Sequence, residues 1–427
     1  MGSTSPPAYS PPRRSPAYTA EPGSNETRIA VTSRRARRSA PSRTFTWRND
    51  TVTLSILGKE EGVASPTYGR SGVVSAEISI NSDTASIMSV AVQIQGVMKL
   101  SIMDTAYAEV PVFLRSYTLW SKHSQTPSSE MCPGTLLFED ILSLTYEDGG
   151  HTYDLPPTYK VQLPGPTGLD VDCSYNITVC VTKSSDSRLW RSHIRDKLVA
   201  EIVYRPRARA YRPILSSPFP FSSTIKAVPE EWRQVPSKMV PYPSQSHIEA
   251  IDCLLFIPAV QIYSLSDNIP VYLQLRGRVS SLRAFMHTAP PTSALSSLFR
   301  HSVTPQPPEQ PTVSVFLSRQ VTVSIQGQRA TRLIKLGEAN LCSIPPDVNL
   351  AMQDHDGLAN LDYEGEVRCT QDETVGSFFT RQLLVKDHIV VHLVPSGTER
   401  SPLQEHRNSY PIRLVTEPFQ EEPDIDT

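Results

Sequence analysis

Apolar and polar residues alternate along much of this chain, most regularly between residues 90 and 102. In the segment Val90–Ile102 the apolar side chains share one parity and the polar side chains share the other. A period of two is typical of a β-strand with one buried face, whereas a helix would scatter the apolar residues around its circumference. Gly96 falls in step with the apolar set, so we expect a bulge there or the close approach of another group.

The same alternation recurs in both halves of the chain, and only Ser280–Met286 and Ser293–His301 are compatible with a helical turn or two. Many short strands separated by turn residues favour antiparallel sandwiches. We therefore predict an all-β fold of two tandem immunoglobulin-like β-sandwich lobes. The other predicted strands are Thr51–Leu57, Gly72–Ile80, Tyr175–Thr182, Lys197–Tyr204, Cys253–Ile262, Val271–Leu275, Val313–Leu317, Val321–Ile325, His388–Val394 and Tyr410–Val415.

Proline-rich segments divide the chain. Residues 1–44 are rich in Ser, Pro and Arg and poor in large apolar residues, a composition that predicts a disordered N-terminal tail. A run of prolines between residues 205 and 248 places the boundary between the lobes near residue 215. We expect a first lobe at 45–215, a second lobe at 216–418 with a Pro-rich loop at 284–311, and an acidic tail at 419–427.

Charge and cysteine content narrow the functional classes. A formal net charge of -2 gives no overall field that would attract nucleic acid. No apolar run has the length of a signal-peptide core or a membrane span, so we expect no stable membrane insertion. The six cysteines are scattered and form no Cys-x-x-Cys pair, which favours reduced thiols in a cytoplasmic protein.

Several segments resemble the arrestin pattern. Tyr153–Pro164, which ends in Leu-Pro, is followed by the Tyr-containing strand Cys173–Val181, and Tyr204–Arg207 fits the end of the first lobe. In the second half, Ser264–Leu275 resembles an arrestin strand in which Ile-Pro precedes alternating apolar residues. Ile412–Pro418 resembles a closing segment of fungal arrestin-like proteins. The resemblance extends from residue 46 to about residue 418 and implies a two-lobed, arrestin-like fold.

This resemblance also implies a function. Members of the α-arrestin group are adaptors that bind cytoplasmic tails of membrane transporters or receptors. Their Pro-Pro-x-Tyr motifs recruit WW-domain ubiquitin ligases for endocytosis and trafficking at the plasma membrane or endosomes. Those motifs usually follow the second lobe. Here the segment after the second lobe is short and contains no such motif, which counts against the ligase-recruiting role.

A Pro-Pro-x-Tyr motif does occur in the N-terminal tail, at Pro6, Pro7 and Tyr9. Two prolines favour a polyproline II turn, which enters an aromatic-lined groove at low entropic cost while the tyrosine fills a neighbouring pocket. The alternative is a chance match in a Pro-rich segment. Its accessible position favours a WW-domain site.

A second match, Pro156, Pro157 and Tyr159, lies within a predicted strand of the first lobe. Prolines are tolerated at the edges of sheets, so a structural role for this pair is the favoured interpretation. Binding of a WW domain is the weaker alternative.

A basic cluster in the tail is formed by Arg34, Arg35, Arg37 and Arg38. Such a patch could contact an anionic partner, but a solvated tail or a basic kinase-recognition site is the favoured interpretation. Ser39 follows directly and is a candidate phosphosite, since a phosphoserine can dock to an arginine-lined adaptor.

Catalytic and metal chemistry are not indicated. His388 and His392 have the spacing of a helical zinc pair, but they lie in a predicted strand, where they would be about 13 Å apart. Asp354–Gly357 resembles only a fragment of a calcium loop. We therefore predict no catalytic residues, no metal and no cofactor.

Two alternatives to the adaptor remain at this point. One is an arrestin-fold interaction scaffold without ligase recruitment. The other is a secreted β-sandwich enzyme or carbohydrate-binding module, which would need paired carboxylates or an aromatic platform. The four tryptophans are dispersed, and a Cys173–Cys180 disulfide would favour this second alternative.

Overall fold

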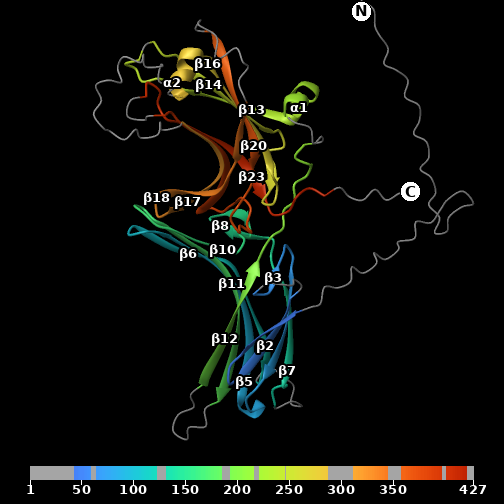
Figure 1. The fold of residues 1–427 in the computed structure, drawn as a ribbon. Helices are drawn as coiled ribbons and strands as arrows, with labels where there is room; N and C mark the ends of the chain where they lie inside the picture. The colour runs from blue at the N-terminus through green and yellow to red at the C-terminus, as the bar shows by residue number, and fades with distance from the viewer. Residues whose placement is uncertain are drawn as a thin grey trace, which may run out of the picture.

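The computed structural model has two β-sandwich lobes arranged end to end (Figure 1). It describes residues 43–58, 64–122, 131–184, 193–215, 221–245, 247–286, 311–344, 357–396 and 401–420. No helix in this part of the chain has the length and apolar character that crossing a bilayer requires. The predicted tail at residues 1–44 falls almost entirely outside the described residues.

The first lobe is a sandwich of two sheets. One sheet has the order β1 (Arg43–Arg48), β2 (Val52–Gly58), β4 (Val73–Ile80), β7 (Thr135–Ile141). The other has the order β3 (Thr67–Tyr68), β12 (His193–Tyr204), β11 (Leu169–Ser184), β5 (Ile87–Ile102), β6 (Ala106–Ser121), with β10 (Tyr159–Leu163) also paired to β11. A separate hairpin consists of β8 (Thr145–Asp148) and β9 (His151–Asp154), and a 3-10 turn spans Thr84–Ser86.

The second lobe repeats this plan. One sheet has the order β13 (Trp232–Met239), β14 (Ile251–Pro258), β16 (Ile269–Arg278), β20 (Leu358–Val367), β19 (Asn340–Ile344). The other has the order β15 (Ile262–Ser264), β23 (His406–Val415), β22 (Leu383–Val394), β17 (Thr312–Ile325), β18 (Gln328–Glu338), with β21 (Phe378–Phe379) also paired to β22. Two short helices, α1 (Phe221–Ala227) and α2 (Val279–Met286), and a 3-10 turn at Pro229–Glu231 accompany them.

The pairing is antiparallel except at β3–β12 and β15–β23, which are parallel. Along β11 burial alternates residue by residue, as the sequence pattern predicts for a strand with one face in the core. The prediction of an all-β fold with two sandwich lobes is confirmed.

Gly96 fulfils both expectations for it. The register between β5 and β6 shifts between Gly96 and Val97, which is a bulge. A Cβ atom at Gly96 would also collide with the ring of Tyr175 on β11. Glycine is needed here because the tyrosine ring lies directly over the backbone of β5.

The boundaries of two predicted strand segments were wrong. Val313–Leu317 and Val321–Ile325 belong to one continuous strand, β17, because the polar residues between them continue the register. The segment Cys253–Ile262 breaks into β14 and β15 at Pro258. The helical turn predicted at Ser280–Met286 is part of α2, and most of the predicted loop at 284–311 lies outside the described residues.

Candidate functional site at the junction of the lobes

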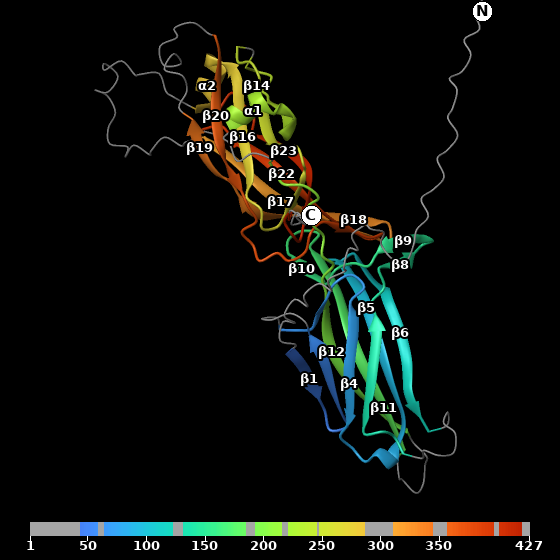
Figure 2. The ribbon, with the colours of Figure 1, turned by 90° about the vertical axis from the view of Figure 1, so that its right-hand side faces the viewer.

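The hairpin of β17 and β18 leaves the second lobe and packs against the first, as Figure 2 shows. Val321, Val323 and Ile325 at the end of β17 are buried in the same apolar cluster as the core of the first lobe. Leu383 and Val385, at the start of β22, belong to that cluster too. The two lobes therefore share one hydrophobic core at their junction.

Polar contacts surround this shared core. The side-chain amide of Gln326, in the β17–β18 turn, donates to the carbonyl of Tyr107 at 3.1 Å. Asp148, in the β8–β9 hairpin, accepts from Gln382 at 2.7 Å and forms an ion pair with Arg381 at 3.3 Å. The two contacts of Asp148 hold the β8–β9 hairpin against the start of β22.

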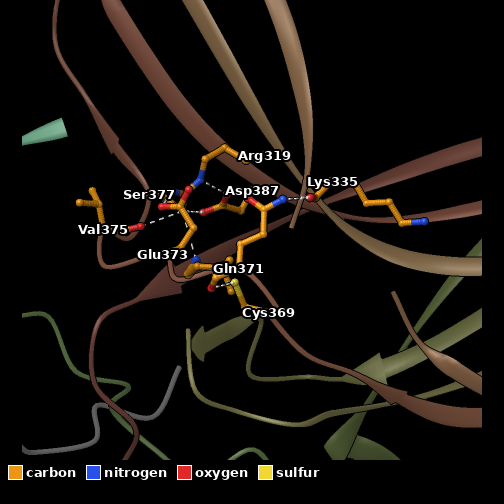
Figure 3. Close-up of polar contacts among 9 residues, drawn as sticks. Arg319, Lys335, Cys369, Gln371, Glu373, Val375, Ser377 and Asp387 are labelled. Carbon is orange, nitrogen blue, oxygen red and sulfur yellow. Dashed lines mark hydrogen bonds and ion pairs between the residues drawn. The ribbon is translucent and has the colours of Figure 1, made fainter. Parts of the chain in front are cut away.

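An ion cluster with a fully buried centre lies next to the shared core (Figure 3). Arg319 on β17 and Asp387 on β22 are both 0% exposed and lie directly opposite each other in the register. The guanidinium donates to both carboxylate oxygens of Asp387, at 2.8 and 3.1 Å. It also donates to Glu373 at 2.8 Å and to the carbonyl of Val375 at 2.8 Å.

These contacts keep Arg319 charged. Burial alone would lower the pKa of Arg319, but its hydrogen bond to Asp387 and the charges of Asp387 and Glu373 outweigh burial and raise that pKa. Ser377 donates a further hydrogen bond to Asp387 at 2.7 Å. Arg319, Asp387 and Glu373 thus place a buried guanidinium between two carboxylates with good geometry. We call these three residues the polar anchor of the otherwise apolar junction.

The second Pro-Pro-x-Tyr motif lies at this anchor. Tyr159 is 5% exposed, and its ring contacts Phe378 edge-on with centroids 5.6 Å apart. The hydroxyl of Tyr175 donates to the carbonyl of Pro156 at 2.5 Å. Burial raises the pKa of Tyr159 to about 12, against an opposing effect of Arg319. A WW domain needs this tyrosine side chain in its own pocket, and in this conformation the side chain is packed between the lobes.

A cleft of about 480 Å³ opens beside Pro156, Pro157 and Phe378 and is lined by both lobes and the linker between them. One wall is apolar and includes Leu155, Pro156 and Phe379. The charged residues that line it are Arg70, Asp154, Arg205, Lys386 and Arg413. Arg70 and Asp154 pair with each other at 3.3 Å. The cleft is thus a basic and apolar hollow.

A shallower hollow adjoins this cleft and shares Arg205 with it. Glu417, which lines it, pairs with Arg207 at 3.4 Å and with Arg209 at 2.8 Å. Glu373 lines the same hollow while holding Arg319. The buried ion cluster therefore extends to the surface through Glu373, whose side chain is 19% exposed.

The other residues singled out in the sequence are not part of this site as the structure describes it. Pro6, Pro7, Tyr9, Ser39 and the cluster Arg34–Arg38 fall outside the described residues. His388 and His392 lie on β22, where a carboxylate oxygen of Glu405 accepts from the Nε2 of His392 at 2.6 Å. Within the described ranges, no three His, Cys, Asp or Glu side chains come together as a metal site would require.

The cysteines named for the secreted alternative are both on β11. Cys173 is buried, Cys180 is half-buried, and both are free thiols. Seven residues along a strand span about 23 Å, far beyond the reach of a disulfide. The fold therefore provides no Cys173–Cys180 bond.

Sequence reasoning missed the Arg319–Asp387 pair, although a signal existed. Arg319 occupies the same parity as Leu317 and Val321, which face inward, and Asp387 occupies the inward parity of β22. A charge at a core position of one strand predicts an opposite charge at a core position of a neighbouring strand.

No model of a known protein family matches this chain, and no protein of curated function does either.

Proposed function

We propose that this protein is an arrestin-like adaptor or scaffold that binds cytoplasmic parts of membrane proteins. The observation that supports this most is the shared core of the two lobes, which makes them one platform with faces and a cleft supplied by both. Large rigid surfaces of this kind suit protein recognition, and the sequence resemblance to arrestins assigns the partner class. Its action as an adaptor is expected in the cytoplasm, with recruitment to the plasma membrane or endosomes.

Ligase recruitment is assigned to the N-terminal motif at Pro6, Pro7 and Tyr9. The second motif is unsuited to this role because Tyr159 is packed between the lobes. We expect a peptide of residues 1–20 to bind a WW domain in the micromolar range, and Tyr9→Ala to abolish binding. Tyr18→Ala is the matched control, since Tyr18 follows Pro16-Ala17 and lies outside the motif.

Fluorescence anisotropy of the labelled peptide measures both variants. If the unmodified peptide does not bind, or if Tyr18→Ala weakens binding as much as Tyr9→Ala, ligase recruitment by this motif is refuted. The protein would then be an interaction scaffold without ligase recruitment, which is the second candidate.

Cargo binding is tested separately from ligase binding. Affinity purification from cytosol and solubilised membranes with the full chain should recover membrane proteins, and residues 44–427 should recover them equally well. Only the full chain should also recover a WW-domain ligase. Recovery of no membrane protein by either form would contradict the adaptor role.

A further inference from the structure

The cleft between the lobes has an unbalanced positive charge. Four of its lining residues are cations, Arg70, Arg205, Lys386 and Arg413, and its one lining carboxylate, Asp154, is already paired with Arg70. None of the other three cations forms an ion pair with another described residue. The adjoining hollow shares Arg205 and contains Glu373 and Glu417, but these carboxylates pair with other arginines. Three guanidinium or ammonium groups thus line the cleft without an ion-pair partner among the described residues.

Two of these cations lie where the pairing of β22 with β23 ends. The last pair is Asp387 with Ile412, and Lys386 and Arg413 are the next residues of the two strands. Both are exposed and both line the cleft. Like charges on neighbouring strands repel each other, and a bound anion would relieve that repulsion. Arg205 adds a third cation from the linker.

The rest of the cleft suits an apolar or aromatic group. Phe379 on β21 is 65% exposed, an unusual exposure for a large aromatic side chain, and its ring contacts Tyr153 edge-on at 6.4 Å. Leu155 and Pro156 form the wall beside it. A volume of about 480 Å³ lies within the range of sites for small molecules, which combine apolar walls with a few convergent polar groups.

We propose that this cleft binds a small phosphate ester with an aromatic or apolar body. Two guanidinium forks and one ammonium group match a dianionic phosphate better than a single carboxylate, and the forks can each bind two of its oxygens. The aromatic body lies against Phe379. Because the ligand contacts both lobes and the linker, its binding stabilises the native arrangement of the whole chain.

Isothermal titration calorimetry of the full chain with 1-naphthyl phosphate tests this assignment. We expect saturable binding at one site, about tenfold tighter than that of inorganic phosphate or of 1-naphthol, because each lacks one half of the recognised chemistry. Lys386→Gln and Arg413→Gln should each weaken binding about fivefold or more, as expected for charge-assisted hydrogen bonds. Phe379→Ala should weaken binding of 1-naphthyl phosphate but not of inorganic phosphate.

Lys99→Gln is the control, since Lys99 is an exposed cation on β5 outside the cleft. Lys386, Arg413 and Lys99 are all exposed, and unchanged thermal unfolding without ligand verifies that their variants fold. Absence of saturable binding, or equal weakening by Lys99→Gln, overturns the proposal. A gain of about tenfold in affinity on deletion of residues 421–427 also overturns it, because that acidic segment would then be the occupant of the cleft. None of these results depends on the adaptor role or on the WW-domain motif.

Discussion

At the scale of single residues, the junction depends on the charge balance around Arg319. Arg319→Met leaves Asp387 and Glu373 without a cation in a buried site. We expect a loss of about 3–5 kcal/mol in the free energy of unfolding, the usual result of removing one partner of a buried pair. Urea denaturation measures it. Lys335→Met is the control, because the Lys335–Glu338 pair is exposed and should contribute less than about 1 kcal/mol.

The pH dependence of that variant gives a second readout. Without Arg319 the two carboxylates are buried and unpaired, so their pKa values should rise. A folded-state pKa above the unfolded value means that stability increases as the pH falls. The deficit of Arg319→Met should therefore shrink between about pH 7 and about pH 5, near the carboxyl range. A pH-independent deficit would indicate lost packing instead of uncompensated charge.

Tyr159 supports a separate prediction about its ring and its hydroxyl. The Tyr159 hydroxyl makes no hydrogen bond of normal geometry with a described group, although it lies close enough to Arg319 to interact with its charge. Tyr159→Phe should therefore change the free energy of unfolding by less than about 1 kcal/mol at pH 7. Tyr159→Ala should cost about 3–5 kcal/mol through the cavity beside Phe378. Because burial raises the pKa of Tyr159 to about 12, the unfolded chain loses this proton first. Stability therefore falls above about pH 10, and Tyr159→Phe should lessen that fall. Chemical denaturation at both pH values distinguishes the variants.

At the scale of elements, the sequence predicted strands best where one face is buried and the other is exposed. The alternation in Val90–Ile102 located most of β5, and the phase of Gly96 predicted its bulge. β17 was divided into two strands because Ser318, Arg319 and Gln320 interrupt its apolar run. That interruption is compensated by acidic partners 54 and 68 residues away, Glu373 and Asp387, which local periodicity does not register.

Gly96 also allows a prediction at this scale. Gly96→Ala places a methyl group against the ring of Tyr175, whose hydroxyl holds Pro156. We expect a loss of about 1–3 kcal/mol from overpacking. Gly134→Ala is the matched control, because a Cβ atom there meets nothing within 4 Å. Equal stability of the two variants in thermal unfolding would mean that the strands separate without cost at the bulge.

At the scale of the whole molecule, the docking of the two lobes could not be predicted from the sequence. Local patterns identify the buried face of β17 but not which lobe buries it, since the choice depends on contacts between residues over 200 positions apart, such as Gln326 with Tyr107. The same limit applies to the cleft, whose four cations come from four separate segments. The second Pro-Pro-x-Tyr motif is recognisable in the sequence, but its structural role depends on the other lobe, because Tyr159 packs against Phe378 there.

The shared core predicts how the molecule unfolds. Interfaces between domains of one chain are usually small and polar, so that domains unfold separately. Here Val323 and Leu383 of the second lobe are buried in the core of the first, which should couple both lobes into one calorimetric transition. Val323→Ala combined with Leu383→Ala removes that coupling and should split the transition in two. Leu273→Ala, confined to the core of the second lobe, should lower the midpoint while leaving one transition. Two transitions in the unmodified protein would show that the lobes are energetically independent. The proposed adaptor function would then lose its main support, which is that the two lobes form one platform.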